Sequence, residues 1–186
     1  MLKKGDEQYD DLRSFVYSNH SNMSDELQKI SRDTFFETFA HSTSEENMRD
    51  YLENNFSKEQ LSKEIEDEHS AFYFAKLEDV VIGYLKINYS GAQTELNDQK
   101  SLEVERIYIV KEFYGKGVGQ LLLDFALQIA KQQQMNYVWL GVWEENHRAI
   151  QFYLKNGFIT FDKHVFMLGE EVQNDFMMKL ELKNVE

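Results

Sequence analysis

A short turn with three glycines separates an apolar segment from a helix-like segment near the middle of the chain. Tyr114–Gln120 reads Y-G-K-G-V-G-Q; it follows the apolar segment Arg106–Val110 and precedes an apolar run that begins at Leu121. Glycine adopts left-handed backbone conformations and carries no side chain, so successive backbone N–H groups can converge on an anion. The N-terminus of the following helix adds the positive end of its dipole. The turn therefore predicts a strand–turn–helix unit that binds a pyrophosphate group.

The spacing of the glycines argues against two common nucleotide-binding turns. A dinucleotide-binding G-x-G-x-x-G would begin at Gly115 or Gly117, but residues 120 and 122 are Gln and Leu. A P-loop needs Gly-Lys followed by Ser or Thr, whereas Lys116 is followed by Gly117. A glycine-rich turn that binds nothing is the remaining alternative. The residues expected to contact the anion are Gly115, Lys116, Gly117, Val118, Gly119 and Gln120.

The apolar pattern predicts early helices followed by a β-rich half. A chain of 186 residues with 42% hydrophobic residues is long enough for a single core, and we expect an N-terminal extension over 1–11 and one domain over 12–186. Strands are expected at 12–18, 71–77, 80–88, 102–110, 137–143, 158–161, 164–168 and 176–182. Helices are expected after a cap at Ser24, near Ser44 and Lys58 from the capping boxes Ser42-x-x-Glu45 and Ser57-x-x-Gln60, and over 121–133 and 146–156.

The strand expected over 102–110 carries the acidic candidates for proton transfer. Strict alternation places Leu102, Val104 and Arg106 on one face and Glu103, Glu105, Ile107 and Ile109 on the other. Either Glu103 or Glu105 can receive a proton or hold a cationic substrate. The alternative for each is an exposed carboxylate at a strand edge.

The helix expected over 146–156 carries a second pattern. Asn146, Ala149, Ile150 and Tyr153 follow one another at i, i+3, i+4 and i+7, so they share one face. A phenol with a pKa of about 10 can act as a general acid. A core helix in which Tyr153 is only a packed aromatic residue is the alternative.

Together these two patterns resemble the GNAT acetyltransferases. The turn matches their acyl-CoA loop, Arg/Gln-x-x-Gly-x-Gly/Ala, at Gly117 and Gly119, although Tyr114 replaces the usual Arg or Gln. The stretch Asn146-x-x-Ala149-x-x-Phe152-Tyr153-x-x-x-Gly157-Phe158 is similar to their second motif. The resemblance implies an α+β fold with a central, mostly antiparallel mixed sheet flanked by helices, in which two strands splay apart. It also implies acetyl-CoA as co-substrate, bound in that gap.

The same resemblance assigns roles to single residues. Tyr153 is expected to lie next to the sulfur as general acid, Asn146 to hydrogen-bond the cofactor arm, and the backbone N–H of Ile109 to stabilise the oxyanion. Direct attack by the amine is favoured over a covalent acyl-enzyme. Beyond the glycine turn, the expected cofactor contacts are Ile107, Tyr108, Ile109, Val110, Asn146, Ala149, Phe152 and Lys155. Lys111, Lys116, Arg148 and Lys155 are candidate partners of the CoA phosphates.

A narrower resemblance concerns the acceptor. The strings 101–109, Trp139–Glu144 and His164-x-Phe166-x-x-Gly169-x-Glu171-x-Gln173-x-Asp175 are similar to bacterial PaiA-type polyamine N-acetyltransferases, which implies spermidine or spermine as substrate. Carboxylates available for a polycation are Glu103, Glu105, Glu170, Glu171 and Asp175. The alternatives are an acetyltransferase for a protein N-terminus, a lysine or another small amine, and a non-catalytic acyl-CoA-binding regulatory module.

Composition narrows the partners and the compartment. The formal charge is −13, with 33 acidic and 20 basic residues and no basic cluster, so nucleic acid is not expected and a cationic amine is favoured. The chain has no cysteine and no apolar stretch of about 18 residues, which argues against disulfides, thiolate metal sites and a membrane span. The five histidines show no metal-ligand spacing. We expect a cytoplasmic protein without a metal, and a homodimer through an exposed strand edge.

Overall fold

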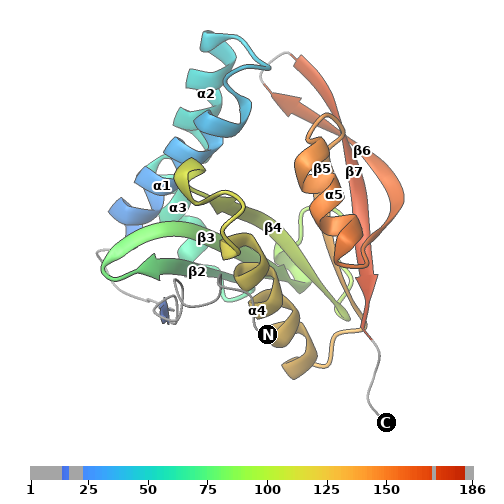
Figure 1. The fold of residues 1–186 in the computed structure, drawn as a ribbon. Coiled ribbons are helices and arrows are strands. Elements are labelled where there is room, and N and C mark those ends of the chain that lie inside the picture. Colours follow the sequence, from blue (N-terminus) through green and yellow to red (C-terminus); the bar gives the residue numbers. More distant parts are fainter. Residues whose placement is uncertain (1–13, 17–22, 169–170, 183–186) are drawn as a thin grey trace, which may run out of the picture.

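The protein folds around a twisted seven-stranded sheet with helices on both faces (Figure 1). The structure is a computed structural model that describes residues 14–16, 23–168 and 171–182. The strands are β1 (Ser14–Val16), β2 (Ser70–Leu77), β3 (Val80–Tyr89), β4 (Ser101–Ile109), β5 (Tyr137–Trp143), β6 (Ile159–Leu168) and β7 (Glu171–Glu181). The helices are α1 (Met23–Phe39), α2 (Glu45–Asn55), α3 (Lys58–Glu66), α4 (Val118–Gln132) and α5 (His147–Lys155).

The sheet is antiparallel except at its centre. Its strand order is β1-β2-β3-β4-β5-β7-β6, and within it only β4 and β5 are parallel neighbours in the described residues. The pairing of β4 with β5 covers only Ser101–Glu103 against Tyr137–Trp139, although both strands continue beyond it. The predicted α+β fold with a splayed mixed sheet is confirmed.

Two apolar cores lie on opposite faces of the sheet. One contains Leu122 and Ala126 of α4 and Tyr153 of α5, packed against β3, β4 and β5. The other joins α1, α2 and α3 to β2 and β3, with Phe35 and Phe74 among its buried members. Figure 1 shows α4 on one side of β3 and β4 and the α1–α3 group on the other. The gap between β4 and β5 therefore connects two well-packed halves.

Two predicted helix caps, at Ser24 and Ser42, were wrong. The helix α1 begins at Met23, which is buried, so Ser24 lies inside its first turn instead of capping it. The Ser42 hydroxyl donates to the carbonyl of Phe39 at the end of α1, and Ser44 caps α2. The predicted cap at Ser57 is confirmed, because its Oγ accepts a hydrogen bond from the backbone N–H of Gln60.

Several element boundaries also differ from the prediction. The two strands expected at 158–161 and 164–168 form one strand, β6, with a bulge between Thr160 and Asp162. The strand β7 begins at Glu171, five residues before the expected start at Phe176, and α4 begins three residues before Leu121. Of the strand expected at 12–18, β1 is described; residues 12, 13, 17 and 18 and the extension 1–11 lie outside the described residues.

A bulge in β4 overturns the expected strict alternation. The register pairs Ile87 with Val104 and Lys86 with Arg106, so Glu105 is an additional residue on β4. After the bulge, Ile107 and Ile109 pack on the α4 side together with Leu102 and Val104. Arg106 lies with Glu103 and Glu105 on the opposite side, where all three line a cavity. The predicted shared face of the two glutamates therefore holds, but the predicted positions of Arg106, Ile107 and Ile109 were wrong.

Candidate active site

The gap between β4 and β5 exposes backbone groups of β4. The N–H of Val110 bonds to the carbonyl of Ile82 on β3. Because N–H directions alternate along a strand, the N–H groups of Ile109 and Ile107 point the other way, toward β5. Those of Tyr108 and Val110 face β3. The gap can therefore accept an extended chain through the backbone of Ile107 and Ile109, whereas Tyr108 contributes its side chain to the cavity wall.

The glycine turn ends at an uncapped helix N-terminus. Gly115 and Gly117 have φ values of 73° and 86°, which favour glycine, and Gly117 is the N-cap of α4 without any side-chain cap. The first-turn N–H groups of Val118, Gly119 and Gln120 have no acceptor within the helix. A β-carbon at Gly119 would lie 3.3 Å from Cδ1 of Ile109. The turn thus presents a set of backbone donors beside the end of β4.

Three polar side chains lie around the turn, those of Gln120, Lys116 and Arg148, and each has a different partner. The Gln120 amide donates to Asn156 Oδ1 at 2.7 Å and to Asp124, so its side chain is already engaged and only its backbone faces the turn. Lys116 is exposed and lies over the ring of Phe113 at 5.1 Å. The guanidinium of Arg148 stacks 3.5 Å from the ring centre of Tyr114, which places a cation beside the position that Tyr114 occupies in the turn.

The helix α5 and its N-cap bring the residues of the second motif to the same gap. Asn146 caps α5, its Oδ1 accepting the N–H of Ala149 at 3.2 Å, so its amide nitrogen is left to donate. Ala149 and Tyr153 line the cavity. Burial raises the pKa of the Tyr153 phenol above its usual value, so this group keeps its proton at neutral pH. Phe152 packs toward Gly119, and Lys155 is exposed.

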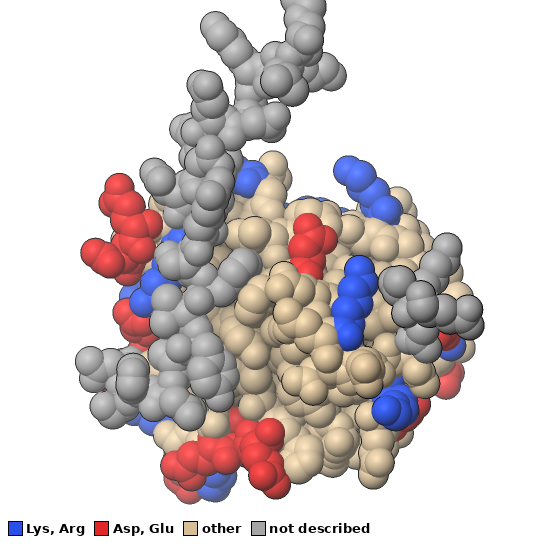
Figure 2. All heavy atoms as spheres, turned by 90° about the horizontal axis from the view of Figure 1, so that it is seen from below, with Lys and Arg blue, Asp and Glu red and all other residues tan. Residues whose placement is uncertain are grey.

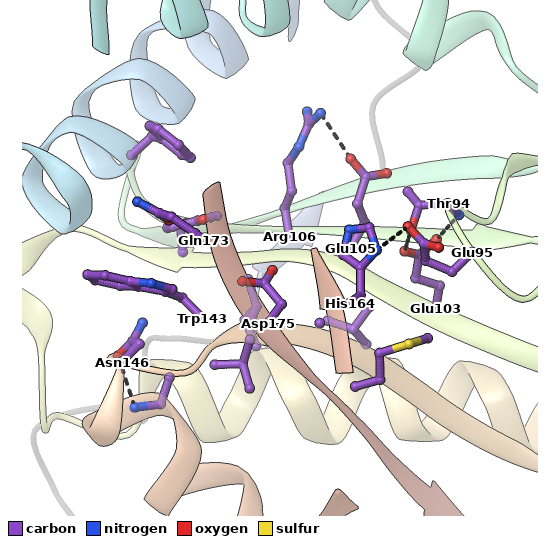
Figure 3. A pocket seen from close by; sticks show the side chains of 18 of the residues that line it. Thr94, Glu95, Glu103, Glu105, Arg106, Trp143, Asn146, His164, Gln173 and Asp175 are labelled. Atoms are coloured by element: carbon purple, nitrogen blue, oxygen red, sulfur yellow. Dashed lines mark hydrogen bonds and ion pairs between the residues drawn. The ribbon is translucent and has the colours of Figure 1, made fainter. Parts of the chain in front are cut away.

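A cavity of about 350 Å³ joins this gap to the other face of the sheet (Figure 3). One wall is aromatic and another is polar. The aromatic residues are Phe35, Phe39, Tyr51, Phe56, Tyr108, Trp139 and Trp143, and the polar ones include Thr94, Glu95, Glu103, Glu105, Arg106, His164, Gln173 and Asp175. From these residues the cavity passes through the gap to Tyr153, which belongs to the core on the α4 side. The two halves of a transfer reaction can meet there.

Glu103 lies buried at the closed end of the gap. Its Oε2 accepts hydrogen bonds from Asn88 Nδ2 at 3.0 Å and from the backbone N–H of Thr94 at 2.9 Å, and its Oε1 accepts from Thr94 Oγ1 at 2.5 Å. Burial raises the pKa of Glu103, and the bonds from Thr94 and Asn88 only partly oppose this effect. With no cation paired to it in the described residues, Glu103 has the properties of a proton acceptor.

Glu105 is held in a buried network with two cations. Lys86 Nζ lies 2.6 Å from its Oε2 and Arg106 Nη2 lies 3.0 Å from its Oε1. Glu64 of α3 bridges the same two cations, with a bidentate contact to Arg106. Burial would raise the pKa of Glu105, but Arg106 and Lys86 together outweigh it and hold that pKa below its usual value. Glu105 is therefore better suited to positioning than to accepting a proton.

The sequence interpretation missed the part of the wall made by the 90–100 loop and β6. His164 Nδ1 lies 3.1 Å from Glu95 Oε1, and Thr94 binds Glu103, so residues far apart in sequence meet at the cavity. No periodic pattern marks Thr94 or Glu95. Of the carboxylates considered for a polycation, Asp175 lines the cavity, whereas Glu171 accepts hydrogen bonds from Ser44 and Asn47 at the start of α2. Glu170 lies outside the described residues.

The comparison with protein families settles the class. The model of the acetyltransferase (GNAT) family matches residues 24–158, which include the gap, the glycine turn and α5. The chain belongs to the GNAT acetyltransferase family. It is an acetyl-CoA-dependent N-acetyltransferase.

Relatives at several distances share this family. An uncharacterized N-acetyltransferase of the pepI 3' region from Lactobacillus delbrueckii subsp. lactis is 42% identical over 154 residues, covering 83% of this chain and 89% of that protein. A spermidine N(1)-acetyltransferase from Thermoplasma acidophilum is 29% identical over 140 residues, covering 73% and 82%. The crystal structure of PaiA N-acetyltransferase from the same organism, in complex with coenzyme A, superposes with a TM-score of 0.73 at 25% identity, covering 91% and 99%.

The residues present fit acetyl-CoA as the co-substrate. The open backbone of β4 suits an extended chain, and the uncapped N-terminus of α4 suits a diphosphate, since glycines at 115 and 117 leave open space around it. Bound there, acetyl-CoA supplies an acetyl group activated as a thioester. The chain's part is to hold it, to orient the acceptor and to move protons.

Few features of the described residues favour binding to nucleic acid, a membrane or a metal ion. Blue side chains stand apart from one another on the face shown in Figure 2, so the described residues form no continuous basic patch there. No helix within the described ranges has the length and apolar character needed to cross a membrane. Those ranges also contain no group of three or more His, Asp or Glu residues placed to hold a metal ion.

Proposed function

We propose that this acetyltransferase acts on a primary amino group of a small polycationic amine of the spermidine or spermine kind. The observation that carries the proposal is the charge of the cavity. Four carboxylates line it, Glu95, Glu103, Glu105 and Asp175, against Arg106 and His164. Arg106 and Lys86 are paired with Glu64 and Glu105, so the carboxylates that remain to favour a cation are Glu95, Glu103 and Asp175. The similarity to a spermidine N(1)-acetyltransferase adds support.

The proposed chemistry uses three groups of the chain. Glu103 takes the proton that the acceptor ammonium must lose before its nitrogen attacks the acetyl carbon. The N–H of Ile109 stabilises the charge that develops on the acetyl oxygen. As the new N–C bond forms and the C–S bond breaks, Tyr153 donates its proton to the sulfur, and the second proton that the nitrogen must lose then restores the Tyr153 phenol. Glu105 holds the bulged strand in place through Lys86 and Arg106 instead of acting as the base.

The proposed co-substrate contacts follow from the same placement. Backbone groups of Ile107 and Ile109 bind the pantetheine arm, and the turn binds the diphosphate through backbone N–H groups. Tyr108, Val110 and Phe152 shape the walls instead of donating. Asn146 donates its amide to the arm beside Ala149. Lys116, Arg148 and Lys155 are proposed to contact the outer phosphates.

A panel of acceptors tests the substrate class. Initial rates of thiol release from acetyl-CoA are measured with spermidine, spermine, 1,4-diaminobutane, a peptide with a free N-terminus and a lysine peptide. Because the chain has no cysteine, a thiol reagent reports coenzyme A alone. We expect kcat/KM for spermidine or spermine to exceed that for either peptide by about tenfold or more. Turnover confined to peptides would overturn the polyamine assignment and favour a protein acetyltransferase.

A non-catalytic acyl-CoA-binding module is the contrasting function. It predicts coenzyme A binding by calorimetry without thiol release for any amine. The buried, protonated Tyr153 beside the gap and the unpaired Glu103 favour an active enzyme instead.

We also propose a homodimer that forms through β6. This strand lies at the edge of the sheet. The side chains of Val165 and Met167 on β6 are 53% and 50% exposed, and that of Val172 on the neighbouring β7 is 66% exposed. Exposed apolar edge strands are prone to pair. Light scattering at micromolar concentration should give twice the chain mass of 22.1 kDa, and a Val165→Lys variant should be monomeric.

A further inference from the structure

Two adjacent acceptors on β7 have no donor. Gln173 Oε1 and Asp175 Oδ1 are buried, and neither has a hydrogen-bond partner among the described residues. Gln173 is only 8% exposed. Both residues line the cavity from alternate positions of one strand, so they share its inner face (Figure 3). A buried acceptor without a donor costs about 1–3 kcal/mol, so this pair calls for donors from outside the chain, supplied by water in the unliganded protein and by a ligand when one is bound.

The surroundings of Asp175 do not supply a cation that satisfies it. On β6 its register partner is His164, whose Nδ1 lies 3.1 Å from Oε1 of Glu95 in the 90–100 loop and therefore faces that carboxylate. Glu144, directly after β5, adds a negative charge nearby that is itself paired with Lys163 at 3.2 Å. Burial raises the pKa of Asp175 to about 6, with Glu144 contributing and His164 opposing, so the group is still largely ionised at neutral pH. The site is thus anionic and lacks donors.

This chemistry selects one kind of ligand group. Gln173 Oε1 and an ionised carboxylate are both acceptors, and an ammonium group carries three donors and a positive charge. An anion would be repelled, and an apolar group would leave both acceptors unsatisfied. The site therefore fits a protonated amine.

The position of the site separates it from the proton acceptor. A β-carbon at Gly141 would lie 3.6 Å from Asp175 Oδ2, and Asp175 pairs with Trp143 on β5. Glu103 lies on β4 opposite Trp139, at the closed end of the gap. The two carboxylates thus approach the cavity from different strands. Binding to both requires an acceptor whose two cationic nitrogens span the separation between them.

We propose that Gln173 and Asp175 bind the second, non-reacting ammonium group of the acceptor, while the reacting nitrogen lies toward Glu103. The inference rests on the proposed function and adds to it a pair of specificity-determining residues. It makes Gln173 and Asp175 responsible for the preference for diamines and polyamines over monoamines. Neither residue takes part in proton transfer.

The test compares matched amines that differ by one charge. Kinetics with saturating acetyl-CoA are measured for 1,4-diaminobutane and 1-aminobutane in the wild type, Asp175→Asn and Gln173→Leu. Glu181→Gln, the same carboxylate-to-amide change at the far, exposed end of β7, is the control. We expect Asp175→Asn to lower kcat/KM for the diamine by about 10- to 100-fold, the range for a lost charge-assisted hydrogen bond. The monoamine should change less than about threefold, and Gln173→Leu should show a smaller loss of the same kind.

Binding measurements separate failure of this inference from failure of the proposed function. Calorimetry measures 1,4-diaminobutane binding to the protein saturated with coenzyme A. Binding that is lost in Asp175→Asn supports the site even if the wild type shows no turnover with polyamines, an outcome that would overturn only the proposed substrate. Equal losses for both amines would overturn the inference in favour of a role in proton transfer. An unchanged ratio of the two kcat/KM values, or no diamine binding to the wild type, would also overturn it.

Discussion

Glu103 on β4 and Trp139 on β5 are the last residues at which these parallel strands pair. Beyond them the strands separate, and the cavity opens beside the exposed backbone of β4. Trp139 is fixed by a hydrogen bond from its Nε1 to Gln93 Oε1 at 2.6 Å, so the closed end of the gap is rigidly defined. The carboxylate of Glu103 therefore lies at the closed end of the gap, where the proposed mechanism brings the acceptor and the thioester together.

Replacing Glu103 by Gln should remove the proton acceptor. The pKa of Glu103 is raised by burial, so its basic form is lost as the pH falls through that raised value. The wild-type kcat should consequently decrease on the acid side, and Glu103→Gln should lower kcat by about 10²-fold or more and flatten that side. The measurement is a pH–rate profile, with Asp79→Asn in the β2–β3 turn as the control. An unchanged acid side in Glu103→Gln would contradict the assignment.

Replacing Tyr153 by Phe should affect the chemical step and leave the fold intact. Burial alone raises the pKa of the phenol, so it enters the reaction protonated. We expect kcat to fall about 10²-fold or more while KM for acetyl-CoA changes little. Tyr137→Phe, which alters a hydrogen-bonded phenol outside the cavity, should retain normal kcat. Equal kinetics for Tyr153→Phe and the wild type would exclude Tyr153 as the general acid.

The glycine turn makes a prediction about co-substrate affinity. Gly117 has a φ of 86°, so Gly117→Ala forces a side chain into a left-handed conformation at about 1–2 kcal/mol and distorts the donors at the start of α4. KM for acetyl-CoA should rise about tenfold, with KM for the amine unchanged. Gly91→Ala also enters open space but lies outside the turn, and it should behave as the wild type. Equal KM values for acetyl-CoA in Gly117→Ala and Gly91→Ala would contradict a role of the turn in binding the co-substrate.

The buried ion-pair network makes a prediction about stability. Glu64→Gln leaves Arg106 and Lys86 sharing the single carboxylate of Glu105, so the free energy of unfolding should fall by about 3–5 kcal/mol. The control on the same helix is Glu59→Gln, which breaks the exposed pair with Lys63 and should cost less than about 1 kcal/mol. Urea denaturation measures both. Equal losses of unfolding free energy in Glu64→Gln and Glu59→Gln would show that the buried ion pairs stabilise the fold no more than an exposed pair does.

Much of the scaffold was predictable because its signals are local. The bounds of β5 and the cap at Ser57 follow from residues close in sequence, as does the left-handed turn at Gly117. These features depend on a few neighbouring side chains or on an uninterrupted apolar run. The family motifs lie in the same segments.

The rest depends on contacts that the sequence does not display. The bulge at Glu105 exchanges the two faces of the sheet for the side chains of β4 that follow it. It accompanies the ion pairs that Glu64 of α3 makes with Lys86 of β3 and Arg106 of β4. The start of β7 was missed because Gln173 and Asp175 face a polar cavity instead of an apolar core. Polar residues at these inward positions interrupt the apolar alternation that marks a strand.

The carboxylate of Asp175 leads to a prediction about how the free energy of unfolding depends on pH. Its pKa is about 6 in the folded protein and about 4 when unfolded, so the folded state binds more protons between those values and the free energy of unfolding falls as the pH rises through them. Asp175→Asn should therefore be more stable than the wild type by about 2–3 kcal/mol at pH 7.5, and the difference should vanish near pH 4. Thermal denaturation across this range checks the sign. A less stable variant at pH 7.5 would show that the carboxylate is favourably paired without ligand.

The most direct measurement is a crystal structure of the protein grown with coenzyme A and spermidine. The account predicts coenzyme A between β4 and β5, with its diphosphate on the N–H groups of Val118–Gln120. One spermidine nitrogen should lie toward Glu103 and another within hydrogen-bond distance of Gln173 and Asp175. Coenzyme A in the gap with spermidine elsewhere, or with no nitrogen on Asp175, would contradict it.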